Sequence, residues 1–292
     1  MDSGGVRRAN LAMGGGGVRG VGLVGAVEVL AEAGYVFPRV IGTSAGALVA
    51  AFVAGLTQHG QPMSGLSGLL DRLDYRRLAD PSPIGHLPVV GATLEIASGR
   101  TLYQGSYLKE FVTEQLAGLG VHTFADLALP DGSDTAHLAP SQRYRLAVTV
   151  TDLTLRRGAV LPWDLPEYGI EPDGFPVADA VLASSAIPFV FPAVSLAGKD
   201  GTSSLVDGGV LDDVPVTPLD LSSPQPPTVP SLILSSAASC HRDPARVRSP
   251  PGACLPSEGR ARWWTRSWTW SRRCSPAASR AAWPTRAPRR GP

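Results

Sequence analysis

Residues 10–20 of the chain read NLAMGGGGVRG, and residues 40–46 read VIGTSAG. In the first stretch a short apolar run meets four consecutive glycines, and apolar residues then recur at helical spacing from residue 21 to residue 31. In the second stretch another short apolar run meets a Gly-Thr-Ser-Ala-Gly turn, and a helix rich in Ala and Val is predicted to follow. This succession of strand, glycine turn and helix, made twice, predicts an α/β fold with a parallel sheet.

Further segments with the pattern of a helix or a strand lie later in the chain. They comprise two helices, at residues 108–119 and 177–185, and three strands, at residues 143–151, 159–161 and 205–206. The second of these strands is expected to pair with the first. Pro and polar residues at 130–140 predict a surface loop.

Length and composition set the class of protein. The chain has 292 residues, of which 43% are hydrophobic and 17% charged, a composition typical of a globular protein with a buried core. No run reaches about 18 apolar residues, so no membrane span is predicted. The three cysteines lack metal-like spacing and predict neither a disulfide framework nor a zinc site. With a net charge of +1 and no secretory signal pattern, we expect a cytoplasmic protein without a nucleic-acid partner.

Charge is divided unevenly between two parts of the chain. Residues 1–220 contain 14 Lys or Arg and 23 Asp or Glu, whereas residues 221–292 contain 12 Arg, no Lys and 2 acidic residues. Periodicity also ends near residue 221, although residues 231–238 could form a strand. We expect one domain over residues 9–220 and an irregular tail rich in Arg, Pro and Trp over residues 221–292. A shift of reading frame in the gene and a disordered basic tail that binds anionic lipid or nucleic acid both explain such a tail.

Ser44 is a candidate nucleophile because it lies at the centre of Gly42-Thr43-Ser44-Ala45-Gly46, at a predicted strand–helix turn. A serine nucleophile has to project from such a turn, and glycines two positions before and after it permit the tight backbone. The helix that follows would place its N-terminal dipole beside the reacting carbonyl. Small residues at a tight turn also occur for packing alone, so the motif leaves that alternative open.

The glycines of residues 14–20 permit several interpretations. A P-loop requires Gly-Lys-Ser/Thr, which does not follow. A dinucleotide site fits the spacing of Gly15, Gly17 and Gly20 but lacks the acidic residue expected about 20 positions later. An oxyanion hole requires a nucleophile at the neighbouring strand end, where Ser44 is predicted to lie. A glycine turn without any ligand is the remaining alternative.

The base that would activate Ser44 has two candidates. The histidines have no signature around them; they are His59, His86, His122, His137 and His241. The order Ser44, Asp207, His241 matches that of α/β-hydrolases, but in those enzymes several strands precede the nucleophile, and here only one does. Asp207, at a predicted strand end, could accept the serine proton directly if burial strengthens it as a base, and turn capping is its structural alternative.

Five segments together resemble the patatin-like phospholipases of the bacterial type: residues 15–20, 42–46, 150–153, 184–192 and 207–209. The resemblance covers residues 9–220. It implies a three-layer α/β/α fold with a central, mostly parallel sheet. It also implies a lipid acyl hydrolase that cleaves esters of phospholipids, lysophospholipids or neutral lipids through an acyl-serine intermediate, without a metal or other cofactor.

The same resemblance implies roles for individual residues. Ser44 would be the nucleophile and Asp207 its base, in a Ser–Asp dyad without histidine. The oxyanion hole would comprise Gly15, Gly16 and Gly17, with Arg19 holding the loop. The supporting motif glycines would be Gly20, Gly42, Gly46, Gly208 and Gly209. In one departure, the chain has Asp213 where the family often has Asn.

Substrate choice is expected to depend on residues 56–142. Candidates to line an acyl channel there are Leu66, Leu69, Leu70 and Leu73, and helix core is the alternative for them. The expected partner is a lipid or acyl ester, met by a transient, peripheral contact with a membrane. An inactive relative that binds lipid or a membrane surface without hydrolysis is the alternative function, and a nucleotide-binding module is a third.

Overall fold

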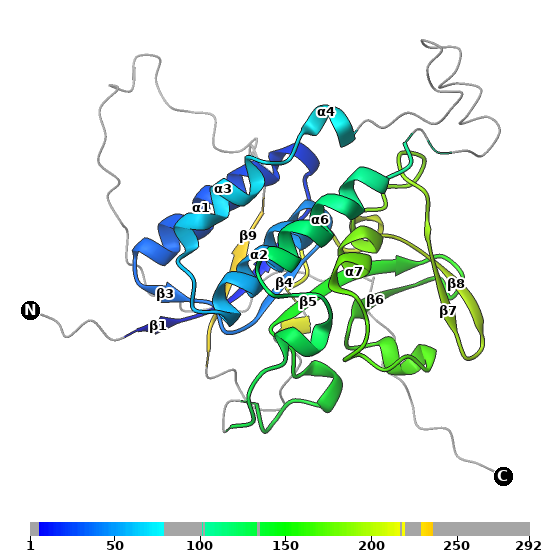
Figure 1. Ribbon diagram of the computed structural model, residues 1–292. Helices are drawn as coiled ribbons and strands as arrows, with labels where there is room; N and C mark the ends of the chain where they lie inside the picture. The colour runs from blue at the N-terminus through cyan, green and yellow to red at the C-terminus, as the bar shows by residue number, and fades with distance from the viewer. Residues whose placement is uncertain are drawn as a thin grey trace, which may run out of the picture. The chain divides into compact units, whose positions relative to one another are not determined.

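The computed structural model describes residues 6–78, 101, 103–132, 135–216, 218–219 and 229–235 (Figure 1). All of these residues belong to the first of two units into which the chain divides after Cys240. Most of the expected tail therefore lies outside the described residues, and both interpretations of it stay predictions. No helix in the described ranges is both long and apolar enough to cross a membrane.

A seven-stranded mixed sheet forms the centre of the fold, in the order β7-β8-β5-β4-β2-β9, with β6 paired to β5 (Figure 1). Its strands are β2 (Asn10–Met13), β4 (Val40–Gly42), β5 (Leu146–Asp152), β6 (Arg157–Leu161), β7 (Val194–Gly198), β8 (Gly201–Asp207) and β9 (Ser231–Leu234). The strands β9, β2, β4 and β5 run parallel, β6 and β8 run antiparallel to β5, and β7 runs antiparallel to β8. The expected α/β class and mostly parallel sheet are confirmed.

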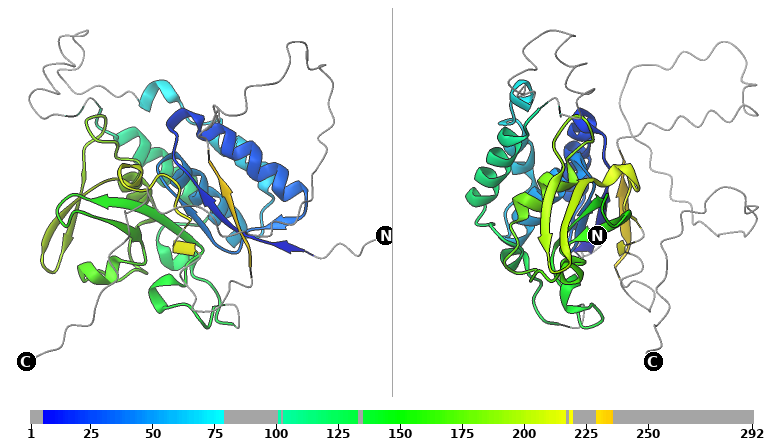
Figure 2. Two further views of the ribbon diagram at one scale, coloured as in Figure 1. Left: turned by 180° about the vertical axis from the view of Figure 1, so that it is seen from behind. Right: turned by 90° about the vertical axis from the view of Figure 1, so that its right-hand side faces the viewer.

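Helices pack together on one face of this sheet (Figure 2). They are α1 (Val21–Glu32), α2 (Ala45–Gln58), α3 (Leu66–Leu70), α6 (Ser106–Gly118) and α7 (Val177–Ser184), with the short α4 (Tyr75–Leu78) beside α6. The central helix α2 contacts β4, β5 and the neighbouring helices, and its residues from Gly46 to Leu56 are all buried. Its small Ala, Gly and Val side chains suit such a position, because they let the helix approach the sheet closely.

The strand sequences explain how the two faces of the sheet are filled. In β5, Leu146, Val148 and Val150 pack into the main core under the helices, whereas Ala147 points into a smaller cluster on the opposite face. Successive side chains of a strand point to opposite faces, so this alternation follows from the sequence. All seven residues of β5 are buried, as expected for a strand at the centre of a sheet.

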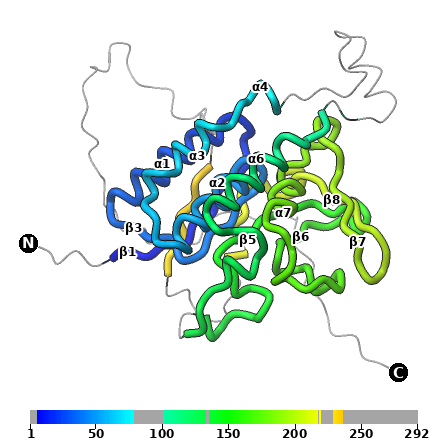
Figure 3. The backbone as a smooth tube through the Cα atoms, in the orientation of Figure 1, coloured from blue at the N-terminus to red at the C-terminus, as the bar shows by residue number. Residues whose placement is uncertain are grey.

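Several helices and strands lie where local sequence patterns predict them. The helices predicted at 108–119 and 177–185 correspond to α6 and α7, and the predicted pairing of residues 159–161 is the antiparallel β5–β6 ladder. A strand is confirmed at residues 231–234 within the predicted 231–238, beside β2 (Figure 3). The strand predicted at 205–206 is longer, because residues 201–207 form a hairpin with β7.

The remaining described elements connect the layers. Two-residue strands β1 (Arg7–Arg8) and β3 (Tyr35–Val36) pair with each other outside the main sheet. Short 3-10 helices are η1 (Gly17–Gly20), η2 (Met63–Gly65), η3 (Phe124–Leu127), η4 (Pro140–Gln142), η5 (Leu165–Tyr168) and η6 (Gly208–Val210). The helix η6 follows β8 directly and η1 follows β2 after three glycines, which places both at the edge of the sheet where the candidate site lies.

Candidate active site

Ser44 occupies the turn between β4 and α2 in a backbone conformation that L-amino acids rarely adopt. Its φ is 54° and its ψ is −122°, and it is the N-cap residue of α2. Its backbone N–H donates to Ser184 Oγ at 3.0 Å, and its carbonyl accepts from the first turn of α2. The turn required of a serine nucleophile is therefore present, with the side chain at the N-terminal end of a buried helix.

The glycines around Ser44 are required by close packing. A Cβ on Gly42 would overlap the backbone of Gly46, and a Cβ on Gly46 would overlap the carbonyl oxygens of Met13 and Gly14. At Gly20, an added Cβ would lie 2.9 Å from Ala45 Cβ. The strand, the turn and the glycine-rich loop therefore touch along their backbones, which fixes Ser44 relative to that loop.

This packing predicts opposite effects of alanine at two glycines. Gly46→Ala is expected to destabilise the fold by about 3 kcal/mol or more, because the new Cβ meets backbone that cannot move without shifting β2. Gly25→Ala, at an exposed helical position of α1 with open space around it, is expected to stabilise by about 0.5–1 kcal/mol. Urea unfolding of both variants measures the difference, and equal stabilities would contradict the packing argument.

Asp207 meets Ser44 across the sheet edge. It ends β8, where it pairs with Val150 of β5, and its carboxylate accepts a hydrogen bond from Gly209 N–H at 2.7 Å. Gly208 makes this approach possible, because a Cβ there would overlap Thr149 of β5. The Ser44 side chain is close enough to influence the Asp207 carboxyl, so two residues separated by 163 positions in sequence are brought together.

Burial dominates the electrostatics of Asp207. The side chain is almost fully buried, and desolvation raises the pKa of its carboxyl above the ordinary value. The hydrogen bonds from Ser44 and Gly209 act in the opposite direction, and the negative charge of Asp213 raises the pKa further. A raised pKa makes the carboxylate a stronger base than a solvated aspartate.

The glycine-rich loop lies beside Ser44. Gly16 and Gly17 have φ values of 144° and 56°, and the loop leads into η1. Within the part of the chain that the structure describes, the backbone N–H groups of Gly16, Gly17 and Ala45 have no acceptor. Such groups at a loop and at the start of a helix are suited to hold an anion. The N–H of Gly15, which was also expected in the oxyanion hole, instead donates to the Asp213 carbonyl at 3.0 Å. The Arg19 side chain is exposed, and the residue contacts the loop through its backbone N–H, which donates to Gly16 O at 3.2 Å.

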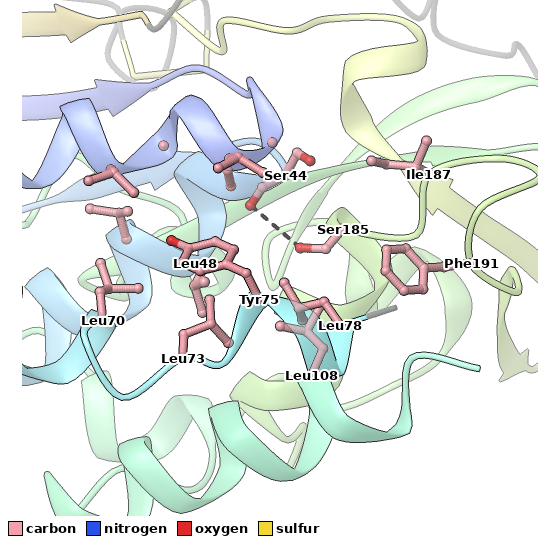
Figure 4. Close-up of a pocket in the computed structure, with 16 residues that line it drawn as sticks. Ser44, Leu48, Leu70, Leu73, Tyr75, Leu78, Leu108, Ser185, Ile187 and Phe191 are labelled. Carbon is pink, nitrogen blue, oxygen red and sulfur yellow. Dashed lines mark hydrogen bonds between the residues drawn. The ribbon is translucent and has the colours of Figure 1, made fainter. Parts of the chain in front are cut away.

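A cavity of about 220 Å³ opens beside Ser44 (Figure 4). Its lining is mostly apolar: Gly17, Val18, Gly20, Val21, Ser44, Ala45, Leu48, Val49, Leu70, Leu73, Tyr75, Leu78, Leu108, Ser185, Ile187 and Phe191. Of the leucines expected to line a channel or a helix core, Leu70 and Leu73 line the cavity, whereas Leu66 lies in the core and Leu69 packs against it. Leu70 and Leu73 belong to the buried core as well, so the helix-core alternative is confirmed and their place in an acyl channel stays a prediction.

Several residues of the site were given no individual role from the sequence. Ser184 and Ser185, at the C-terminal end of α7, hydrogen-bond the backbone of Ser44: Ser184 Oγ accepts from its N–H, and Ser185 Oγ donates to its carbonyl at 3.5 Å (Figure 4). The hydroxyls of Thr43 and Thr149 lie 2.7 Å apart. Ser184, Ser185 and Thr43 lie in segments that carry the family resemblance, whereas Thr149 has no signal beyond polarity in a buried strand.

The described histidines do not complete a triad with Ser44 and Asp207. His59 and His122 lie near Asp126, and His59 caps the C-terminal end of α2, about 21 Å from its start at the rise of an α-helix. His86 and His241 fall outside the described residues, so the alternative built on His241 stays a prediction. No cluster of His, Cys, Asp or Glu suited to a metal ion occurs among the residues described.

Comparison with known proteins shows the family to which the sequence belongs. Residues 11–220 match the sequence model of a family described as Patatin-like phospholipase. The chain is 37% identical over 206 residues to the uncharacterized protein YqhO of Bacillus subtilis (strain 168), and the match covers 69% of this chain and 63% of that protein. The chain thus spans less than two thirds of the length of this curated relative.

Solved structures with a similar fold include VipD from Legionella pneumophila and the type III effector protein ExoU. VipD is 19% identical, with a TM-score of 0.40 and coverage of 72% of this chain and 47% of that chain. ExoU is 20% identical, with a TM-score of 0.37 and coverage of 61% and 40%. By the match over residues 11–220, the chain belongs to the patatin-like phospholipase family and has its α/β fold.

Proposed function

We propose that the chain is a lipid acyl hydrolase in which Ser44 is the nucleophile and Asp207 its base. The observation that carries the proposal is the placement of the Asp207 carboxyl beside the Ser44 side chain, which lines an apolar cavity. Patatin-like phospholipases act on lipid substrates, and this chain belongs to that family. The dyad and the cavity together supply what hydrolysis of an acyl ester requires: a nucleophile, a base and a site for the chain.

In the first step, Ser44 Oγ attacks the ester carbonyl carbon while its proton passes to the Asp207 carboxylate. The carbonyl oxygen becomes an oxyanion, and the N–H groups of Gly16, Gly17 and Ala45 are placed to donate to it. The N-terminus of α2 adds a favourable dipole at the same point. These donors are fixed by the glycine packing, so little reorganisation is needed as the charge develops.

Collapse of the tetrahedral intermediate breaks the ester bond. The proton held by Asp207 passes to the departing alcohol oxygen, and the acyl group remains on Ser44. Water then repeats the sequence in the second half of the reaction: Asp207 accepts its proton, the hydroxyl adds to the acyl carbon, and Ser44 leaves with the proton returned from Asp207. The products are one alcohol and one fatty acid, and the site returns to its starting state.

The cavity supports an acyl chain as the group that is recognised. Its lining is dominated by Leu, Val, Ile and Phe, and it ends at Ser44 (Figure 4). At about 220 Å³ it lies below the roughly 300–1,000 Å³ of cavities that enclose drug-sized ligands. It therefore suits one hydrocarbon chain, with the polar remainder of the lipid outside.

A serine-reactive fluorophosphonate tests the proposal directly. We expect it to label the wild type on the peptide that contains Ser44 and to leave Ser44→Ala unlabelled, because phosphonylation requires an activated hydroxyl and an oxyanion site. Ser195→Ala is the control, since Ser195 is an exposed serine on β7 that does not line the cavity and should not change labelling. A folded wild type without labelling would instead favour a relative that binds lipid without hydrolysis.

The negative charge of Asp213 is expected to influence how hydrolysis depends on pH. Hydrolysis requires ionised Asp207, so activity should rise as pH rises through the pKa of that carboxyl. Because the negative charge of Asp213 raises this pKa, Asp213→Asn should shift the rise to lower pH. A pH profile of kcat/KM measures the shift, and Asp200→Asn, an exposed carboxylate elsewhere, should leave the profile unchanged. A shift to higher pH would contradict the assignment.

A further inference from the structure

Large apolar side chains are exposed in the segments that line the acyl cavity or lie beside its residues in sequence. The apolar rim, as we name it, comprises Val18, Val21, Ile187, Phe189, Val210 and Leu211. Three of its members, Val18, Val21 and Ile187, also line the cavity itself. Val210 and Leu211 come directly after the Asp207-Gly208-Gly209 turn. Exposed apolar side chains in segments that line a cavity or follow the Asp207 turn indicate an interaction surface.

Phe189 is the member of the rim that folding alone does not explain. It follows Pro188 in a turn closed by Val190 N–H, which donates to the Ile187 carbonyl at 3.1 Å, and its φ is 67°. Gly or Asn is preferred at that position of a turn, since a positive φ is unfavourable for a bulky residue. The ring is nevertheless 67% exposed, so it gains little from burial within the chain. The exposed ring is unfavourable in water, and the positive φ is unfavourable in any solvent. Because no burial within the chain offsets these costs, the two features point to a contact outside the chain.

Basic side chains accompany the rim. Arg19 lies between two residues that line the cavity, and Arg76 lies on α4 between the cavity residues Tyr75 and Leu78. Both are exposed, and no carboxylate of the described residues forms a salt bridge with either. Guanidinium groups beside exposed apolar side chains match the phosphates and the acyl region of a lipid surface.

We propose that the apolar rim docks the protein onto a lipid surface, with its apolar side chains inserted and Arg19 and Arg76 at the level of the phosphates. This inference rests on the proposed function, because a lipid acyl hydrolase has to take its substrate from an aggregate. Continuity between the rim and the cavity gives the acyl chain a path from the lipid phase to Ser44 with little exposure to water. A protein partner would not require the rim to open into an acyl cavity.

Vesicle flotation tests the rim. Vesicles of phosphatidylcholine and phosphatidylglycerol in equal amounts should bind the wild type, and Phe189→Asn together with Leu211→Asn should lower binding at least ten-fold, since two exposed apolar anchors are lost. Asn tolerates a positive φ, so the change at Phe189 should preserve the fold. Hydrolysis of vesicle lipid should fall with binding, whereas hydrolysis of a soluble short-chain ester should keep its wild-type rate.

Two controls separate the outcomes. Val29→Asn removes an apolar side chain on α1 that is similarly exposed but lies eight residues beyond Val21, and it should bind vesicles like the wild type. Ser44→Ala should bind vesicles normally without hydrolysing them, so binding by this variant supports the rim independently of the catalytic assignment.

Unchanged vesicle binding by the rim variant would overturn the inference, as would a wild type that does not bind vesicles while its Ser44 is labelled normally. Loss of self-association rather than of vesicle binding in the rim variant would assign the rim to a second copy of the chain and also overturn it.

Discussion

Ser44→Gly and Ser44→Ala are both expected to lower lipid hydrolysis by about 10⁶-fold. Removing a serine nucleophile from a hydrolase costs on this order in kcat, and what remains comes from binding and the oxyanion site. No other described hydroxyl is bonded to Asp207, so none is placed to substitute for Ser44. Initial rates on a lipid substrate, measured at enzyme concentrations high enough to detect the residual rate, give the factor.

Ser44→Gly is expected to be more stable than Ser44→Ala, which reverses the usual order of glycine and alanine. Alanine is normally favoured over glycine by about 0.5–1 kcal/mol at helical positions. Residue 44 has φ 54° and ψ −122°, a region that costs a residue with a side chain roughly 1–3 kcal/mol. Since both variants lose the same hydroxyl, Ser44→Gly should exceed Ser44→Ala by about 1 kcal/mol in the free energy of unfolding.

Denaturant unfolding of the two variants checks this order, with the wild type as reference. If Ser44→Ala proved the more stable variant, the turn would not hold the conformation described for it. If either variant retained more than about a thousandth of wild-type hydrolysis, Ser44 would not be the nucleophile. The first result bears on the local fold and the second on the chemistry, so the two assignments can fail separately.

The fold was predictable where one strand or helix carries its own signal. The glycine turns after residues 13 and 42 and the buried composition of α2 indicated an α/β sheet edge without knowledge of distant contacts. The pattern of residues 143–151 predicted the strand that the structure shows as β5. These features depend on residues within a few positions of one another, which is why the sequence alone was sufficient.

Other features depend on contacts between distant segments. The pairing of Asp207 with Val150 brings the carboxylate to Ser44, and nothing in the residues near Asp207 specifies that register. Its position at a strand end therefore made Asp207 a candidate base, whereas its assignment to a Ser–Asp dyad with Ser44 followed from the family resemblance. The cavity is likewise assembled from η1, α2, α6 and the 185–191 turn, so its lining could be predicted only for Leu70 and Leu73.

Packing and chemistry are joined at the edge of the sheet. Gly208 lets Asp207 approach β5. Gly42 and Gly46 let the turn that holds Ser44 pack closely against β2. Because glycine has no Cβ, these positions permit the close backbone contacts that hold Asp207 and Ser44 in place. The same geometry buries Asp207, and burial is the largest cause of its raised pKa. Close backbone packing is thus the common origin of the position and the basicity of the carboxylate.

Asp207→Asn is expected to lower kcat by about 10²–10⁴-fold while leaving the fold intact. A positioned general base contributes on this order, and an amide cannot accept the Ser44 proton. The carbonyl oxygen of the substituted side chain can still accept from Gly209 N–H, and its amide nitrogen can donate to Ser44 Oγ, so the turn keeps its hydrogen bonds. Measured kcat on a soluble ester, with far-UV circular dichroism as a check on folding, gives the result.

Asp207→Asn is expected to leave the free energy of unfolding unchanged or to raise it, although it lowers kcat. Because the pKa of Asp207 is raised in the folded state, its ionisation is disfavoured there relative to the unfolded chain. That penalty is absent at low pH, where the carboxyl is protonated in both states, and it grows as pH rises above the pKa of the unfolded chain. At neutral pH, Asp207→Asn should therefore unfold at equal or higher denaturant concentration than the wild type. Full activity in this variant, with activity lost instead in His241→Asn, would replace the dyad by a Ser–His–Asp arrangement.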